Sequence, residues 1–299
     1  MEDGGTCHRI RLEAIMQYRN IGQVKVSAIG LGAMPMSIEG RPDKDQSIRT
    51  IHAALDAGIT LIDTANAYHL LGGEVGHNER LIAEALKSWS GDTSTVLVAT
   101  KGGHLRPGDG SWTQNGDPAY LIQAAKQSLL DLGVEAIGLY YYHRPDPAVP
   151  YEDSVGALKQ LLDDGIILAA GVSNASVAQI DIARAILGPA LVAVQNQYSP
   201  KHRSTSDTLV HCGDLGLAFL PWSPLGGITS AKKLGDKNAP FQQVADAHGV
   251  SPQQVALAWE LAQGRHVIPI PGASRPETIL DSIKAIDLEL TPDDLAQLS

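Results

Sequence analysis

The feature that most constrains the fold of this chain is a repeated order of elements: an amphipathic helix, a glycine and a short apolar strand. Residues 48–55 carry apolar side chains at helical spacing, Gly58 ends that helix, and residues 59–62 form an apolar run. The same order recurs over 155–172 and 251–270. The predicted strands lie near residues 28–31, 59–62, 95–100, 137–142, 167–172, 191–195, 217–221 and 266–269. Eight strands alternating with helices predict an α/β fold, a closed (β/α)8 TIM barrel; an open doubly wound sheet is the alternative.

A length of 299 residues suits either one large barrel or two ordinary domains. Because no linker, internal repeat or low-complexity segment divides the sequence, we predict a single barrel domain over residues 18–299. Within it, residues 18–26 are predicted to form a small β-hairpin that closes the barrel floor. Residues 1–17 form an N-terminal extension that we expect to be disordered.

Composition excludes several classes of function. The formal net charge of -10 argues against binding to nucleic acid or to an anionic membrane, because both require clustered Lys and Arg. Cys7 and Cys212 suggest neither a disulfide framework nor a zinc site, and His202 and His211 have no partners at metal-ligand spacing, so we predict no metal. We find no signal peptide and no run of 18 apolar residues, and expect a cytoplasmic protein. The oligomeric state is not indicated.

Ionisable residues follow three of the predicted strands. Asp63, Lys101 and His143 each come at or directly after a strand end, and Tyr68 lies five residues beyond Asp63. In a barrel these strand ends meet on one face, where active sites form. A carbonyl that accepts a hydride needs a proton donor and a fixed positive charge near its oxygen. Tyr68 can donate the proton, and Lys101 is expected to lower the pKa of Tyr68. Asp63 would keep Lys101 charged, while His143 would orient the carbonyl.

Taken one at a time, these residues also have ordinary structural explanations. Asp63 could cap a helix, Tyr68 could be a packed aromatic residue, and Lys101 could lie in solvent. His143 could be a buried histidine whose hydrogen bonds are satisfied. Four complementary residue types at the strand ends of one barrel favour the catalytic interpretation.

Three motifs carry these residues: Ile62-Asp-Thr-Ala-Asn-Ala-Tyr68, Thr100-Lys101 and the segment 139–146 with His143. In these motifs the chain resembles the aldo-keto reductase superfamily, from about Tyr18 to Leu298, and the catalytic tetrad of that family is matched in order. The short C-terminal tail is similar to that of bacterial members, including pyridoxal reductases. The resemblance implies reduction of a carbonyl by a nicotinamide coenzyme.

The resemblance also implies how a coenzyme is held. Ser173, Asn174 and Gln195 match the residues that bind the nicotinamide carboxamide, and Trp222 matches the aromatic residue that stacks on its ring. The predicted cofactor-binding residues are Gly32, Ser173, Asn174, Gln195, Trp222, Ser223, Leu225, Gly227, Gly272, Ser274, Arg275, Thr278, Asp281 and Ser282.

The segment 270–282 matches the clamp for the adenosine 2′-phosphate but departs from the fuller family pattern. Gly272-Ala273 replaces Lys-Ser, Thr278 replaces an Arg, and Asp281-Ser282 replaces Glu-Asn. Arg275 alone supplies the fork of donors that fits a phosphate, so NADPH/NADP+ is favoured, with NADH as the alternative.

Loops after the strands are expected to line the substrate pocket. The predicted substrate-binding residues are Met34, His69, Trp112 and Arg144. The leading hypothesis is an NADPH-dependent reductase of an aldehyde or ketone that takes a hydride from nicotinamide C4 and a proton from Tyr68. The alternatives are a reductase dedicated to one metabolite, such as pyridoxal or a keto-sugar, and a cofactor-sensing regulatory subunit with little turnover.

Overall fold

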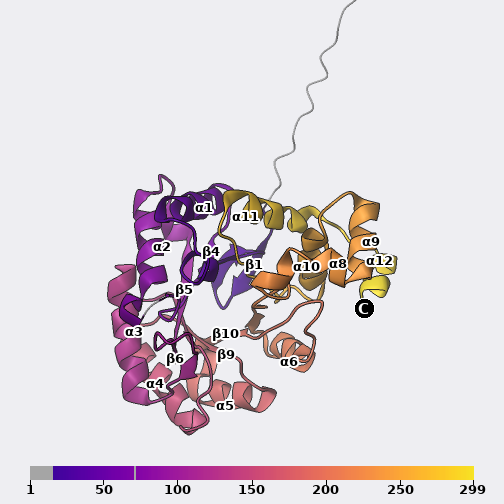
Figure 1. Cartoon of the computed structure of the whole chain (residues 1–299). Coiled ribbons are helices and arrows are strands. Elements are labelled where there is room, and N and C mark those ends of the chain that lie inside the picture. The colour runs from indigo at the N-terminus through magenta and orange to yellow at the C-terminus, as the bar shows by residue number, and fades with distance from the viewer. Residues whose placement is uncertain (1–15, 71) are drawn as a thin grey trace, which may run out of the picture.

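The computed structural model describes residues 16–70 and 72–299 (Figure 1). The predicted N-terminal extension lies outside these residues except for Met16 and Gln17. Gln17 donates from Nε2 to the Ile286 carbonyl at 3.0 Å, and its own carbonyl accepts from the Ala28 amide at 2.8 Å. Within the described residues no helix is long and apolar enough to cross a membrane.

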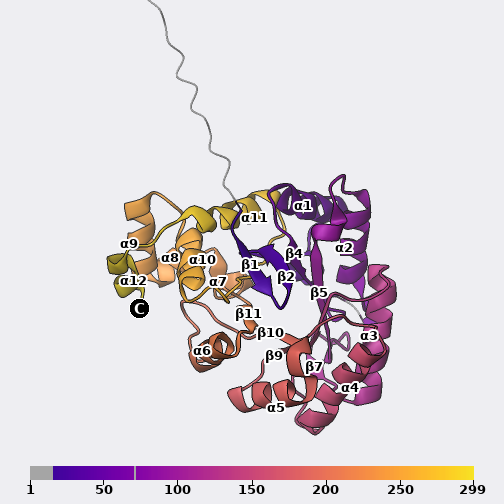
Figure 2. The ribbon, with the colours of Figure 1, turned by 180° about the vertical axis from the view of Figure 1, so that it is seen from behind.

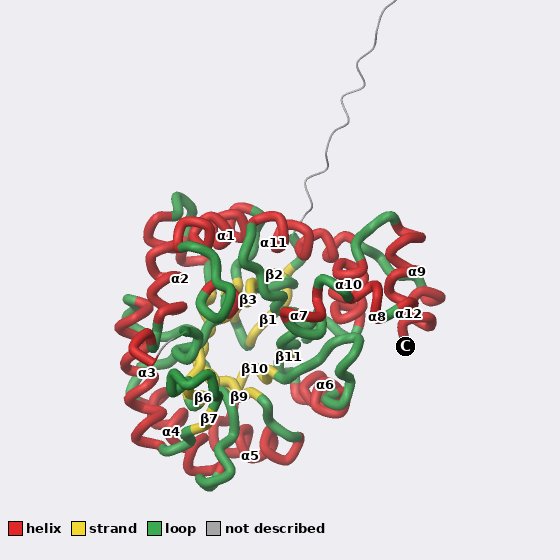
Figure 3. Tube along the Cα trace, viewed as in Figure 1, coloured by secondary structure: helices red, strands yellow, loops and turns green. Residues whose placement is uncertain are grey.

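A curled parallel sheet lies at the centre of the molecule, surrounded by helices (Figures 1 and 3). Its seven strands pair in the order β11-β10-β9-β8-β5-β4-β3. Their bounds are β3 (Leu31–Gly32), β4 (Leu61–Asp63), β5 (Leu97–Gly102), β8 (Leu139–Tyr142), β9 (Ala170–Ser173), β10 (Leu191–Gln195) and β11 (Ala218–Phe219). Most of these strands begin two or three residues later than the sequence pattern predicts, although some of the preceding residues already pair, as in the bridge between Ile137 and Ile167.

Residues 266–273 close the sheet into a barrel. Parallel bridges join Phe219 to Val267 on one side and Gly32 to Gly272 on the other. The sequence predicts a strand here, and the structure has isolated bridges instead. Pro269 and Pro271 lack the N–H that a ladder needs, so toward β3 the segment pairs mainly through their carbonyls, which accept from the amides of Gly30 and Gly32 at 2.9 and 3.0 Å. Toward β11 the Ile268 amide donates to the Phe219 carbonyl at 2.8 Å. The predicted (β/α)8 barrel is confirmed.

The β-hairpin formed by β1 (Tyr18–Ile21) and β2 (Val24–Ser27) covers the barrel floor (Figure 2). Ser27 exchanges two hydrogen bonds with Thr60, the residue before β4, at 2.8 and 3.0 Å. Ile21 and Val26 pack against the apolar side chains inside the barrel. The floor that the sequence predicts is therefore present, and the cavity can open only at the opposite end.

Helices follow the strands and pack their apolar faces on the outside of the sheet. Several start at caps that the sequence specifies: Asp117 with Pro118, Ser176 with Gln179, and Ser251 with Pro252. The larger helices are α1 (Lys44–Asp56), α2 (His77–Ser88), α3 (Pro118–Leu132), α4 (Tyr151–Asp163), α5 (Val177–Leu187), α6 (Ser206–Leu215), α9 (Ala239–His248), α10 (Pro252–Ala262), α11 (Pro276–Ile283) and α12 (Pro292–Leu298). The short elements are η1 (Met34–Met36), η2 (Gly72–Glu74), η3 (Thr93–Thr95), η4 (Gly188–Ala190), η5 (Lys284–Asp287), α7 (Ile228–Ala231), α8 (Leu234–Lys237) and the hairpin of β6 (His104–Leu105) and β7 (Thr113–Gln114).

Candidate active site

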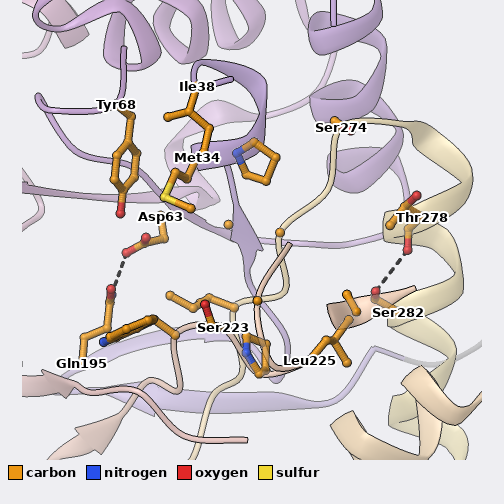
Figure 4. A pocket seen from close by; sticks show the side chains of 18 of the residues that line it. Met34, Ile38, Asp63, Tyr68, Gln195, Ser223, Leu225, Ser274, Thr278 and Ser282 are labelled. Carbon is orange, nitrogen blue, oxygen red and sulfur yellow. Dashed lines mark hydrogen bonds between the residues drawn. The ribbon is translucent and has the colours of Figure 1, made fainter. Parts of the chain in front are cut away.

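A cavity of about 990 Å³ opens at the C-terminal ends of the barrel strands (Figure 4). Asp63, Tyr68, His143 and every predicted cofactor-binding residue line it. Residues far apart in the sequence, from Gly32 to Ser282, thus meet around one space. A volume of this size is in the range of pockets that hold a small molecule or cofactor.

Lys101 lies beneath the cavity wall, at the end of the cavity that Asp63, Tyr68 and His143 line; we call this the candidate catalytic end. Its Nζ donates to Asp63 Oδ1 at 2.6 Å, to the Thr64 carbonyl at 2.7 Å and to Tyr68 OH at 3.2 Å. The second carboxylate oxygen of Asp63 accepts from Gln195 Nε2 at 2.7 Å, as the dashed line in Figure 4 marks. Lys101 is fully buried, and all three of its ammonium donors have an acceptor.

Burial and nearby charge shift the pKa values of Lys101, Asp63 and Tyr68 in opposite directions. Burial alone would deprotonate Lys101, but the charge of Asp63 and the hydrogen bonds to Asp63 and Tyr68 raise its pKa, so it stays an ammonium. Burial also raises the pKa of Asp63, against the opposing effects of Lys101 and Gln195. For Tyr68 burial outweighs the nearby ammonium and raises the pKa. Lys101 thus lowers the pKa of Tyr68 as the sequence predicts, but burial has the larger effect, so the net shift is upward and Tyr68 keeps its proton throughout the neutral range.

His143 lies beside Tyr68, with ring centroids 5.9 Å apart and the planes nearly perpendicular. Burial, together with the charges of Lys101 and Arg144, holds the pKa of His143 well below its usual value, so the imidazole is neutral. Its Nδ1 is buried and has no hydrogen-bond partner within the described residues. The ring thus retains hydrogen-bonding capacity that a bound molecule can use.

The nicotinamide end of the predicted cofactor site is built from β9 and β10. Ser173 Oγ donates to the Gln195 carbonyl at 2.7 Å, and Asn174 Nδ2 donates to Ser173 Oγ at 3.0 Å and to the His143 carbonyl at 2.9 Å. Asn174 and Ser223 both have a left-handed backbone, with φ of 57° and 52°. Such strain at non-glycine residues concentrates at functional sites.

Residues 222–227 present backbone to the cavity. Gly226 and Gly227 have φ of 81° and 96°, conformations that favour glycine, and a Cβ at Gly227 would meet no described heavy atom within 4 Å. Trp222 lines the cavity, and its Nε1 is buried without a described partner. A tryptophan at the cavity wall, glycine backbone without a Cβ and this unused donor fit a nicotinamide dinucleotide.

The far end of the cavity is lined by the start of α11. Gln46 Nε2 donates to the Ser274 carbonyl at 2.9 Å, and Arg275 precedes the first turn of α11 and makes no side-chain hydrogen bond or ion pair with described residues. Ser282 Oγ bonds the Thr278 carbonyl at 3.0 Å (Figure 4). Asp281 instead accepts from Ser251 and Gln254, so its carboxylate ties α11 to α10.

Among the four predicted substrate-binding residues, Met34, Trp112 and Arg144 line the cavity and His69 does not. His69 is 1% exposed, because the chain turns directly after Tyr68, with the His69 amide donating to the Ala67 carbonyl at 3.1 Å. The structure therefore does not bring His69 to the cavity wall, and a contact between His69 and a substrate stays a prediction.

Sequence reasoning missed several lining residues, among them Glu39, His104, Gln114, Lys232 and Gln253. His104 follows Lys101 closely in the sequence, so the same strand end could have indicated it. Lys232 lies after α7 and carried no motif. No group of His, Cys, Asp and Glu within the described residues is arranged to bind a metal.

Comparison with known proteins agrees with this geometry. The profile of the Aldo/keto reductase family matches residues 28–299. The uncharacterized oxidoreductase C215.11c of Schizosaccharomyces pombe is 32% identical over 282 residues, which cover 93% of this chain and 87% of that protein. The thermostable aldo-keto reductase Tm1743, solved with the inhibitor epalrestat, is 26% identical with a TM-score of 0.78 over 95% of this chain and 98% of that one. The glycerol dehydrogenase AKR11B4 from Gluconobacter oxydans is 28% identical with a TM-score of 0.80 over 94% and 93%. The chain therefore belongs to the aldo/keto reductase family and is an oxidoreductase of carbonyl compounds.

Proposed function

We propose that this protein reduces an aldehyde or ketone to an alcohol with NADPH, and that Tyr68 donates the proton. The observation that carries the proposal is the hydrogen-bonded group of Asp63, Lys101 and Tyr68, with the neutral ring of His143 beside it at the cavity wall. These residues place a proton donor, a fixed positive charge and a neutral imidazole around one point, as reduction of a carbonyl requires.

Each residue has a separate role in the proposed reaction. Tyr68 holds its proton in the resting site because burial raises its pKa. It gives up that proton when negative charge develops on the carbonyl oxygen, and Lys101, 3.2 Å from the phenol oxygen, stabilises the resulting phenolate. His143 orients the carbonyl oxygen, and Asp63 keeps Lys101 charged and in place.

The coenzyme would lie along the residues that line the remainder of the cavity, and when bound it supplies the hydride. Ser173 and Asn174 would hold the carboxamide, and Trp222 the face of the ring. Arg275 and Lys232 both line the cavity and are positively charged. Two cations at the wall favour the extra phosphate of NADPH over NADH, because a guanidinium and an ammonium both bind phosphate well.

The test compares the parent with Tyr68→Phe, following NADPH absorbance with a set of aldehydes, ketones and pyridoxal. We expect Tyr68→Phe to lower kcat by roughly 10²–10⁴-fold, the usual contribution of a general acid, and to bind NADPH as the parent does in a fluorescence titration. Tyr18→Phe is the matched control, since Tyr18 is an exposed tyrosine on the floor hairpin.

Equal carbonyl reduction by Tyr68→Phe and the parent would contradict the proposal. A single compound with a kcat/KM far above the others would identify a reductase dedicated to one metabolite. Tight NADPH binding with one turnover and no sustained reaction would instead indicate a cofactor sensor.

A further inference from the structure

Aromatic and imidazole rings form one continuous wall at the candidate catalytic end of the cavity. The ring of His104 lies 4.9 Å from that of His143 and 4.8 Å from that of Trp112, centroid to centroid, and Tyr68 extends the row from the other side of His143. His104 comes from β6, and Trp112 directly precedes β7. The His143 ring is nearly perpendicular to those of Tyr68 and His104, at 83° and 78°, so a flat ring system would gain contact area along this wall by edge-to-face contacts as well as by stacking.

Arg106 fixes the outer part of the wall. Its guanidinium lies over the Trp112 ring, 4.9 Å from the centroid, and bonds to the carboxylate of Glu39 and to the His69 carbonyl. The Arg106 side chain is 2% exposed, so the indole rests on a buried and anchored cation. Trp112 is thereby held in position before a substrate arrives.

Arg144 lines the same part of the cavity and is largely unpaired. Its guanidinium makes a single hydrogen bond to a described residue, from Nη2 to Asn174 Oδ1 at 3.3 Å, while Nε is buried without a partner. The carboxylate nearest in sequence, Asp146, accepts from the amides of Gly116 and Ala148, both at 2.9 Å. The positive charge of Arg144 therefore has no acid to pair with among the described residues.

Other charges around Arg144 are balanced or absent. Asp63 pairs with Lys101, and Glu39 pairs with Arg106. His104 is neutral, because burial and the charge of Arg144 lower its pKa to about 4. Arg144 thus gives the candidate catalytic end of the cavity an excess of positive charge, and a half-buried cation with open donors is stabilised by an anionic oxygen group.

We propose that Arg144 binds a carboxylate or phosphate group of the substrate while the flat body of that substrate lies against His104 and Trp112. This inference rests on the proposed function and narrows its substrate to aromatic or heteroaromatic aldehydes and ketones that carry an anionic group. Arg144 is then the residue that determines specificity.

The test uses three aldehydes with one ring in common: 4-carboxybenzaldehyde, 4-formylphenyl phosphate and the neutral ester methyl 4-formylbenzoate. The parent is compared with Arg144→Gln and with Arg49→Gln, which removes the same charge from an exposed site on α1. We expect the parent to prefer at least one anionic aldehyde over the ester by about 10-fold to 100-fold in kcat/KM, the usual effect of a hydrogen bond to a charged group. The ratio of kcat/KM for the anionic aldehyde to that for the ester should fall to about one in Arg144→Gln and stay at the parent value in Arg49→Gln. The anionic aldehyde with the larger ratio in the parent identifies whether Arg144 binds a carboxylate or a phosphate.

A binding measurement separates this inference from the proposed function. The alcohol 4-(hydroxymethyl)benzoate is titrated into protein saturated with NADP+, with tryptophan fluorescence as the signal. We expect Arg144→Gln to weaken Kd about tenfold or more, and to leave the weaker binding of the neutral methyl ester within about twofold. The inference would be overturned if the anionic-to-ester ratio of kcat/KM were the same in the parent and Arg144→Gln. It would also be overturned if Arg144→Gln weakened the binding of 4-(hydroxymethyl)benzoate and of its neutral methyl ester equally. Failure of the parent to reduce any aldehyde, with charge-selective binding retained, would overturn only the proposed function.

Discussion

Replacing Lys101 by Met tests the buried ion pair on which the candidate catalytic end of the cavity depends. Lys101 is fully buried and Asp63 is 3% exposed, and their 2.6 Å contact is the main compensation for burying two charges. Methionine fills a similar volume without an ammonium. The carboxylate of Asp63 would then keep Gln195 as its one hydrogen-bond donor among the described residues, and the Thr64 carbonyl would lose the Lys101 ammonium.

The expected loss of stability follows from this geometry. Removing one partner of a buried ion pair costs about 3–5 kcal/mol, because the other charge stays buried and uncompensated. For a domain of this size that corresponds to a fall in Tm of roughly 10 °C. The double variant Asp63→Asn with Lys101→Met removes both charges, so its loss should be at least about 2 kcal/mol smaller than the sum of the two single losses.

The loss in Lys101→Met should also depend on pH. Burial already raises the pKa of Asp63, and loss of the ammonium raises it further. A carboxyl with a folded pKa above its unfolded value stabilises the fold in acid and loses that contribution as pH rises through the folded pKa. The deficit relative to the parent should therefore be smaller in acid and grow as pH rises.

Urea unfolding of the parent, both single variants and the double variant at several pH values measures these quantities, and NADPH oxidation with an aldehyde measures kcat. Removing the charge beside Tyr68 should lower kcat by roughly 10²–10³-fold, the size of effect seen when one stabilising group is lost from a developing negative charge. A deficit that does not change with pH, together with additive losses in the double variant, would refute the reasoning.

Three further predictions concern other parts of the chain. Burial raises the pKa of Glu79 to about 7, so the protonated carboxyl stabilises the fold in acid and this contribution is lost as pH rises through about 7. The free energy of unfolding of the parent should therefore exceed that of Glu79→Gln in acid and lose this excess at higher pH, as urea unfolding at several pH values would measure. In Gly32→Ala the new Cβ would lie 2.7 Å from the Ile270 carbonyl, which forces the barrel seam apart and should lower Tm by several degrees in a thermal melt; Gly73→Ala is the control, since a Cβ at this exposed site meets nothing within 4 Å and its backbone is not left-handed. Arg275→Gln should raise the Kd for NADPH about tenfold and leave that for NADH within about twofold in a fluorescence titration, whereas equal weakening of both would place Arg275 away from the extra phosphate.

A cavity residue could be predicted from the sequence where an ionisable residue follows a predicted strand, because both its chemistry and its position then indicate a site. Asp63, Lys101 and His143 come at the ends of apolar runs, and parallel strands bring their C-terminal ends together. The barrel could likewise be predicted from periodicity, because each helix needs an apolar stripe and each buried strand a short apolar run. Both patterns can be recognised in short stretches of sequence, and alternating helices and strands of this kind form a (β/α)8 barrel.

Other features depend on contacts that no local pattern contains. His69 follows Tyr68 directly, yet the backbone turn buries it while Tyr68 lines the cavity. Lys232 lines the cavity because the chain brings the segment after α7 to the cavity wall, and no pattern around Lys232 in the sequence indicates this. The eighth strand was predicted from apolar residues, but Pro269 and Pro271 leave it bridged to its neighbours at isolated positions.

The pKa of Tyr68 illustrates what a sequence cannot supply. The sequence identifies a lysine near the tyrosine, and from charge alone the phenol should be more acidic; the depth of burial reverses the sign. The consequence for the proposed reaction is specific. Because Tyr68 stays protonated at rest, Lys101 contributes little to creating a phenolate before substrate binds, and its charge acts mainly once the proton has begun to move toward the carbonyl oxygen. An interaction that strengthens as the reaction proceeds raises kcat rather than tightening ground-state binding. Loss of Lys101 should therefore appear in kcat, with the KM for the aldehyde changed much less.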